Sequence, residues 1–273
     1  MTRCWLWLLP AVVLSACAGT VDPEPAHTLS QAIAGAHRSD ADRARDAWRH
    51  PAETLSFFGL RPDMTVVEIY PGGGWYTAIL APALRDQGKL IAAHYGDATG
   101  SEYRTRSHDA FVKKLEQDPA TYGRVEVIAY FPPERTSLGP AGSVDMVVTF
   151  RNLHGMVGAG TAEGFFAAAH DVLKPGGVLG VVQHRAAAGV DPAESAKKGY
   201  VPEQAVIQMA QAAGFVLGGR SEINANPRDT KDYPDGVWTL PPSYRLGDEG
   251  RERYAAIGES DRMTLRFVKP GSD

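Results

Sequence analysis

The stretch VVEIYPGGGWYT, residues Val66 to Thr77, determines the predicted fold of this chain. Thr65 to Tyr70 is an apolar, β-branched run with one acid, Glu68, and such a run is typical of a buried strand. Pro71 and three glycines break the strand, and residues 75–84 can continue as a helix. Glycines let the backbone approach a ligand, and the unpaired N–H groups at a helix start attract it. The stretch predicts the strand–turn–helix unit that opens a nucleotide-type α/β fold, the alternative being a plain tight turn.

Further apolar runs alternate with helical patterns along the chain. The runs are Lys89–His94, Val125–Tyr130, Val144–Phe150 and Val178–His184, and the helical patterns lie near Glu102–Gln117, Thr161–Leu173 and Pro202–Ala213. This alternation predicts a Rossmann-like, doubly wound α/β fold with a mostly parallel seven-stranded sheet. Two later strand candidates, Phe215–Ile223 and Arg262–Val268, are expected to form an antiparallel pair at one edge. Apolar residues alternate in the second of them, which predicts one face exposed to water.

Composition limits the classes of protein to consider. The chain has 273 residues, of which 44% are hydrophobic and 22% charged, as expected for one globular domain with additional segments. The formal net charge is −4 and no basic cluster is present, which argues against a nucleic-acid partner.

The first 17 residues are predicted to be a signal peptide. Arg3 precedes an apolar stretch from Trp5 to Ala18, which is too short for a stable membrane span and has the length of a secretory signal. The stretch contains Leu14-Ser15-Ala16-Cys17, which resembles a bacterial lipobox and implies that Cys17 carries lipid. Ala18 after that cysteine implies an exported, periplasm-facing lipoprotein of the outer membrane rather than the inner one. Cys4 is the only other cysteine, so a mature chain that begins at Cys17 forms no internal disulfide.

The remaining chain is predicted to have three parts. Residues 18–38 are expected to be a tether, and residues 39–60 an N-terminal helical segment in which Ser39 caps a helix. Trp48 and the Phe57-Phe58 pair are expected to seat this segment on the core. Residues 61–273 are expected to form the Rossmann-like domain.

This order of elements resembles a class I S-adenosylmethionine-dependent methyltransferase. The Glu68 strand with its glycine turn corresponds to the first motif, and LKPGGVLGVV to the fifth strand. From about Trp48 onward, the segments YPGGGWYTAILAP, TFRNLHG, QHRAAAG and DRMTLRFVKP are similar to a family of exported predicted methyltransferases. The resemblance implies S-adenosylmethionine as cofactor, no metal, and a small-molecule or envelope acceptor.

Two positions depart from the general methyltransferase pattern. Tyr70 stands where the first glycine is expected, and the second strand ends in His94 instead of an acid for the ribose hydroxyls, with Asp97 three residues later. The candidate cofactor-binding residues are therefore Glu68, Tyr70, Gly72, Gly73, Gly74, His94, Asp97 and Tyr130.

The candidate catalytic residues follow the fourth and fifth strands, because ligands bind at the carboxyl ends of strands in open α/β sheets. They are Arg151, Asn152, His154 and His184. Methyl transfer requires an aligned acceptor and removal of its proton. An imidazole titrates near neutral pH, so His154 or His184 is the expected base, while Asn152 and Arg151 orient the acceptor.

Two other functions remain open at this point. His94, His154 and His184 could hold a zinc ion that activates water in a periplasmic enzyme. Alternatively, the chain is a non-catalytic binding lipoprotein that uses the glycine turn for another ligand. The polar loop at 224–260, with Asn226, Arg228, Asp229 and Asp232, is either a substrate lid or a solvated insertion.

Overall fold

A computed structural model describes residues 1, 25–96 and 100–271 of the chain. The expected signal peptide, its Cys17 and the candidate residue Asp97 lie outside the described residues. Within the described part, no helix combines the length and the apolar composition that a bilayer crossing requires.

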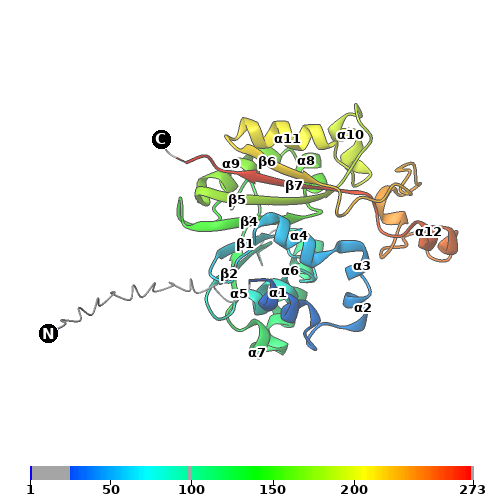
Figure 1. The fold of residues 1–273 in the computed structure, drawn as a ribbon. Coiled ribbons are helices and arrows are strands. Elements are labelled where there is room, and N and C mark those ends of the chain that lie inside the picture. Colours follow the sequence, from blue (N-terminus) through cyan, green and yellow to red (C-terminus); the bar gives the residue numbers. More distant parts are fainter. Residues whose placement is uncertain (2–24, 97–99, 272–273) are drawn as a thin grey trace.

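The centre of the fold is a seven-stranded sheet with the order β3-β2-β1-β4-β5-β7-β6 (Figure 1). All neighbouring strands pair in parallel except β7, which is antiparallel to both β5 and β6 and lies one position in from the edge. The strands are β1 (Thr65–Ile69), β2 (Lys89–His94), β3 (Glu126–Ala129), β4 (Val144–Phe150), β5 (Leu173–His184), β6 (Val216–Ser221) and β7 (Arg262–Val268). The predicted Rossmann-like, mostly parallel architecture is confirmed.

Helices cover both faces of the sheet. They are α1 (Pro25–Ala34), α2 (Asp40–Arg43), α3 (Asp46–Arg49), α4 (Pro51–Phe58), α5 (Thr77–Leu84), α6 (Glu102–Gln117), α7 (Pro119–Tyr122), α8 (Leu153–Gly158), α9 (Ala162–Val172), α10 (Pro192–Lys197), α11 (Glu203–Ala212) and α12 (Arg251–Ile257), with a 3₁₀ turn, η1 (Gly236–Thr239). Side chains of α8, α9 and α11 form one apolar core with the sheet, and those of α1, α4 and α5 form a second core on the other face. Each fully buried large apolar side chain stabilises such a core by roughly 1.5–3 kcal/mol.

The N-terminal helices pack on the sheet more extensively than the sequence indicated. The expectation of a tether over residues 18–38 is wrong for residues 25–34, because α1 buries Leu29 and Ala32 against the core that contains α5. Ser39 caps α2 as predicted, its Oγ accepting a hydrogen bond from the backbone N–H of Asp42. A Cβ at Gly180 of β5 would lie 2.6 Å from the Phe58 ring, so this glycine is what allows α4 to pack so closely.

The expectation that β7 has one face exposed to water is also wrong. Thr264, on the supposedly wet face, has no exposed surface. Asn224 covers it, donating hydrogen bonds from Nδ2 to Oγ1 of Thr264 (2.9 Å) and to Oγ1 of Thr54 in α4 (3.0 Å). The alternation of residue types identified the strand, but α4 and the chain at Asn224 bury its second face.

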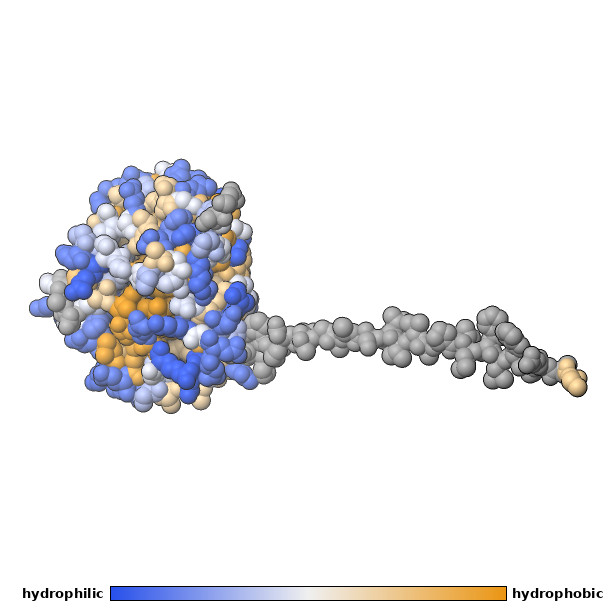
Figure 2. Space-filling model, turned by 90° about the vertical axis from the view of Figure 1, so that its left-hand side faces the viewer, coloured by the Kyte–Doolittle hydropathy of each residue, from blue (hydrophilic) through white to orange (hydrophobic). Residues whose placement is uncertain are grey.

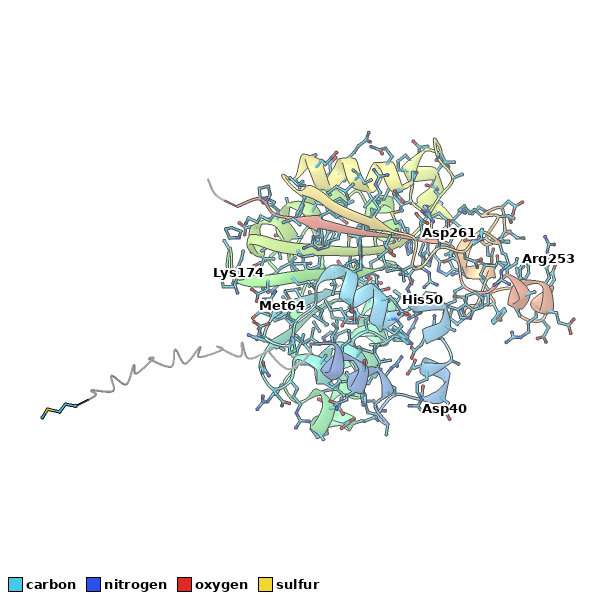
Figure 3. The ribbon with its side chains drawn as sticks, viewed as in Figure 1. Asp40, His50, Met64, Lys174, Arg253 and Asp261 are labelled. Carbon is cyan, nitrogen blue, oxygen red and sulfur yellow. The ribbon has the colours of Figure 1, made fainter. Side chains whose placement is uncertain are left out.

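Segments from both ends of the chain gather at the carboxyl ends of the parallel strands. In Figure 3, Met64 and Lys174 mark the ends where β1 and β5 begin, while His50 and Asp261 lie at the opposite end. The N-terminal helices α2 and α3 and the insertion that carries η1 and α12 lie beside this end (Figure 1). On the face that Figure 2 presents, hydrophilic residues predominate and hydrophobic ones gather in a smaller area. Ligands bind at the carboxyl ends of the strands in open α/β sheets, so this end of the molecule is the place to look for a site.

Candidate functional site

The glycine turn between β1 and α5 presents bare backbone to open space. Gly72 has φ +57°, and a Cβ built on Gly72 or Gly73 would meet no atom within 4 Å. Gly74 differs, because a Cβ there would lie 3.2 Å from the Phe111 ring of α6. Lys114 of α6 donates hydrogen bonds to the carbonyl oxygens of Gly73 (2.9 Å) and Gly74 (3.1 Å) and so fixes the turn from behind.

A cavity of about 670 Å³ opens at this turn, within the range of roughly 300–1,000 Å³ typical of ligand pockets. Eight of the residues predicted for the site line it. They are Glu68, Tyr70, Gly72, Gly73, Arg151, Asn152, His154 and His184. The glycine turn and the ends of β4 and β5 thus face one shared space.

Glu68 of β1 is a buried carboxyl group in the wall of this cavity. Its side chain is 1% exposed, and Oγ1 of Thr77 donates a 2.6 Å hydrogen bond to its Oε2. Burial raises the pKa of Glu68 to about 7, against the opposing effects of the Thr77 hydrogen bond and the nearby Lys114 ammonium. The group therefore titrates near neutral pH.

Tyr70 holds the unusual backbone conformation that its place in the turn demands. Its φ is +46°, a region that favours glycine, and its N–H donates to the Ala93 carbonyl of β2 at 2.9 Å. The ring stacks on Tyr95 at 4.5 Å and packs against Tyr130 at 5.6 Å. Tyr95 lines the cavity. Tyr130 packs against Tyr70 and does not line the cavity, so the direct cofactor contact predicted for Tyr130 is not present.

His94 does not reach the cavity, and its predicted cofactor contact is wrong. The α6 residue Phe111 covers the end of β2, and the His94 ring stacks on it at 5.0 Å. Both ring nitrogens lack a partner with hydrogen-bond geometry among the described residues. Burial, with His108 nearby, lowers the pKa of His94 to about 4. The zinc reading of His94, His154 and His184 is wrong as well, because only the last two come together.

His154 and His184 form a pair at the tips of β4 and β5. Their ring centroids are 5.9 Å apart. Nδ1 of His184 lies 2.5 Å from Oγ of Ser260, and Nδ1 of His154 lies 3.5 Å from Nε2 of the buried Gln183. Burial, with Arg151 nearby, lowers the pKa of His154 to about 4, and burial with His154 and Arg151 nearby holds that of His184 well below its ordinary value. Both imidazoles are therefore neutral at pH 7.

Asn152 and Arg151 behave differently, although both line the cavity. Asn152 is tied to the sheet, donating from Nδ2 to the carbonyl oxygen of Ile69 at 2.8 Å. Arg151 has φ +65°, and its guanidinium makes no hydrogen bond or ion pair within the described part of the chain. Asn152 thus fixes the strand tips, while Arg151 remains available to a ligand.

Two further segments contribute side chains to the cavity wall that were not predicted as site residues. The N-terminal helical segment contributes Asp42, Arg45 and Arg49, and the region before β7 contributes Trp238, Glu259 and Ser260. The spacing of Arg45 and Arg49, four residues apart, places them on the same side of a helical segment and was the one available signal. Nothing in the sequence showed that this side meets Glu259.

The 224–260 region is a packed wall only in part: residues 224–240 and 257–260 are mostly buried or half-buried, whereas most residues from 242 to 256 are exposed. Asn226 donates from Nδ2 to the carbonyl oxygens of Ile257 (2.9 Å) and Glu259 (2.6 Å), and Asp229 accepts from the Asp261 N–H at 2.8 Å. Neither residue lines the cavity, nor do Arg228 and Asp232, which were also predicted to form a lid. Asn226 and Asp229 stabilise the wall, and Trp238 and Ser260 are residues of it that line the cavity.

Comparisons with known proteins agree with the fold. No protein-family model and no curated protein matches the sequence. Among solved structures, a SAM-dependent methyltransferase from Aquifex aeolicus matches with a TM-score of 0.56 and 16% identity, over 83% of this chain and 93% of its own. A methyltransferase from Methanosarcina mazei matches with a TM-score of 0.53 and 11% identity, over 80% and 98% of the two chains. The [4+2]-cyclase SpnF matches with 0.55 and 17%, over 91% and 93%. This chain shares the fold of these proteins.

Proposed function

We propose that this protein is an S-adenosylmethionine-dependent methyltransferase of a small-molecule or envelope acceptor. The observation that carries the proposal is the open glycine backbone and the histidine pair lining one cavity. Two of the structural neighbours are methyltransferases, which agrees with the proposal, while SpnF, a [4+2]-cyclase, shares the same fold.

The residues present fit the cofactor at the glycine turn. Gly72 and Gly73 leave room that a Cβ would occupy, so a ligand can approach their backbone. Glu68 would accept a hydrogen bond from the amino-acid portion, and the aromatic rings of Tyr95 and Tyr103 would form an apolar wall for the adenine. The ribose contact differs from the general pattern, because His94 does not line the cavity and Asp97 lies outside the described residues.

When bound, the cofactor supplies an electrophilic methyl carbon. The protein then has to orient the acceptor and take up its proton. We assign Nδ1–H of His184 as donor to Ser260, which leaves Nε2 of His184 free to accept that proton. His154 is held by Gln183 beside it, and Arg151 faces the same space.

A titration tests the cofactor assignment. S-adenosylmethionine and S-adenosylhomocysteine should bind the purified chain with micromolar Kd by calorimetry. Gly73→Ala should weaken binding about tenfold, because its methyl group enters the space of the ligand. Gly164→Ala, at an exposed and equally open position in α9, is the matched control and should bind normally. Absence of heat and of any thermal shift at millimolar ligand would rule the cofactor out.

A binding protein without transferase activity is the second candidate. Tyr70, stacked on Tyr95 in place of the first glycine, favours it, since the stack narrows the approach to the turn. This second candidate is retained if the chain binds a ligand in the cavity and its function does not require His184, whose Nε2 is the proposed proton acceptor.

We further propose that the chain is exported and anchored through lipid on Cys17, facing the periplasm at the outer membrane. Support comes from the lipobox-like sequence LSAC at residues 14–17. S-adenosylmethionine is charged and does not cross a bilayer unaided, so an exported enzyme needs a cofactor supply outside the cytoplasm. Cells given radiolabelled palmitate should label the wild-type chain and not Cys17→Ser; label in both, or in neither, would refute the anchor.

A further inference from the structure

Four arginines gather near one carboxylate beside the cavity, and three of the four line it. Arg45 and Arg49 come from the N-terminal helices, Arg151 from the end of β4 and Arg262 from the start of β7. The Glu259 carboxylate lies 2.7 Å from Nε of Arg45, 3.3 Å from Nε of Arg49 and 3.2 Å from Nη1 of Arg262. Four positive charges around one negative charge leave a strong local excess of positive charge.

Among the residues that the structure describes, several donors of this cluster have no hydrogen-bond partner. Arg49 is 1% exposed, yet its Nη1 and Nη2 make no hydrogen bond, and Nη2 of Arg45 is also unpaired. The Arg49 guanidinium lies 4.5 Å from the Trp75 ring centroid, which holds it in place without satisfying its N–H groups. Buried guanidinium donors without an acceptor are rare, because removing them from water is costly. Arg49 lines the cavity, and so does Arg151, which is likewise unpaired.

The other acids of the cavity lie elsewhere. Asp42 and Glu68 act on Lys114, behind the glycine turn, and are not among the main charges acting on Arg49 or Arg151. Burial lowers the pKa of Arg49, the neighbouring charges of Arg151, Arg45 and Arg262 lower it further, and the Glu259 carboxylate raises it. An anion bound here would relieve this repulsion.

We propose that Arg45, Arg49 and Arg151 bind a carboxylate or phosphate group of the methyl acceptor. This inference rests on the proposed function for the identity of the ligand, although anion binding itself does not. The acceptor rather than the cofactor fits the cluster, because S-adenosylmethionine carries a net positive charge and the cluster repels it. An acceptor held by Arg151 has its remaining atoms beside His154 and His184, whose pKa values Arg151 lowers.

Thermal shifts with inorganic phosphate and with acetate, at constant ionic strength, test the anion site. Either probe should raise the Tm of the wild-type chain. Arg151→Gln should weaken, at least tenfold, the binding of the anion that gives the larger shift. Arg151→Lys should retain part of the response, and Arg61→Gln, an exposed surface arginine, all of it. Arg151→Gln should also raise the Tm without any anion, because it removes an uncompensated charge, whereas loss of a structural arginine lowers it. A lower Tm with an unchanged anion response would overturn the proposal.

Two further ligands distinguish the sources of the anion. S-adenosylhomocysteine carries the amino-acid carboxylate and methylthioadenosine lacks it. We expect Arg151→Gln to change neither Kd by more than threefold. A tenfold loss for S-adenosylhomocysteine alone would assign the cluster to the cofactor and overturn the acceptor assignment. If neither nucleoside binds the wild type while phosphate binding depends on Arg151, the anion site stands and the methyltransferase proposal fails.

Discussion

Glu68 titrates near neutral pH because it is buried, and this has a consequence for stability. Its folded-state pKa of about 7 lies above the ordinary value of 4.5. Between these values the folded state binds the additional proton, so Glu68 contributes stability that is fully present below pH 4.5 and is lost as the pH rises through 7. The full loss amounts to roughly 3 kcal/mol.

Glu68→Gln should remove this dependence, since the amide oxygen can still accept the Thr77 hydrogen bond. In urea unfolding at pH 5 and pH 8, the free energy of unfolding of the variant relative to that of the wild type should be about 1–3 kcal/mol larger at pH 8 than at pH 5. Glu134→Gln, an exposed acid, is the control and should leave the difference between the two pH values unchanged. An equal effect of Glu68→Gln at both pH values would show that the group stays ionised.

The predicted site residues at the ends of β4 and β5 reached the cavity, because parallel strands deliver their carboxyl ends to one edge. The orientation of an individual side chain at such an end was not predictable. His94 ends β2 as expected, but Phe111 of α6 covers it. Arg49 and Glu259 were missed because they lie 210 residues apart, and only tertiary packing brings them together.

At the scale of elements, the wall at 224–260 depends on one arginine at the end of β5. The Arg185 guanidinium pairs with Asp261 (Nη2–Oδ1, 2.9 Å) and with Glu222 (Nη2–Oε2, 2.6 Å), at the two ends of the wall. A planar guanidinium can contact both carboxylates at once, and a lysine ammonium cannot reproduce that geometry.

Arg185→Lys should therefore loosen the wall while leaving the sheet intact. Amide hydrogen exchange should accelerate at least tenfold over residues 226–261, with β1 and β4 unchanged, and global stability should fall by about 1–3 kcal/mol. Arg220→Lys, a more exposed arginine on β6, is the matched control. Unchanged exchange in the wall would contradict the role of Arg185.

Element boundaries were predicted best where a short apolar run is bounded by polar or turn residues. The predicted limits of β2, β4 and β7 coincide with those observed, and α6 matches its predicted span. Helix α1 was missed because its residues, PAHTLSQAIA, follow a proline-containing stretch that favoured a tether. The wall at 224–260 was predicted as a loop, and its short helices η1 and α12 are ordered by burial of Val237, Leu240 and Tyr254.

At the scale of the whole molecule, three buried or half-buried histidines contribute to the response to acid. His94 and His154 have pKa values of about 4, below the ordinary 6.5, and His184 is shifted in the same direction. The unfolded chain therefore binds more protons between pH 4 and 6.5. Stability is fully present above pH 6.5 and is lost as the pH falls towards 4, against the smaller opposing contribution of Glu68.

His94→Phe should flatten this loss, because His94 already stacks on Phe111 and, among the described residues, neither of its ring nitrogens has a hydrogen-bond partner. In urea unfolding, the free energy of unfolding that is lost between pH 7.5 and pH 5 should be roughly 1–2 kcal/mol smaller for the variant than for the wild type. His50→Phe, at a partly exposed position, serves as the control. The prediction fails if His94→Phe and the wild type lose stability in parallel.

The composition of the cavity wall also bears on synthesis of the chain. Arg45 and Arg49 leave the ribosome before Trp238, Glu259 and Ser260, and Arg45 precedes Glu259 by 214 residues. A nascent chain that lacks Glu259 and Ser260 lacks part of the cavity wall, so we expect a ligand of the cavity to assist folding only after this segment has been made. A truncation that removes Glu259 and Ser260 also removes β7, which pairs with both β5 and β6, so the cavity and this part of the sheet are lost together.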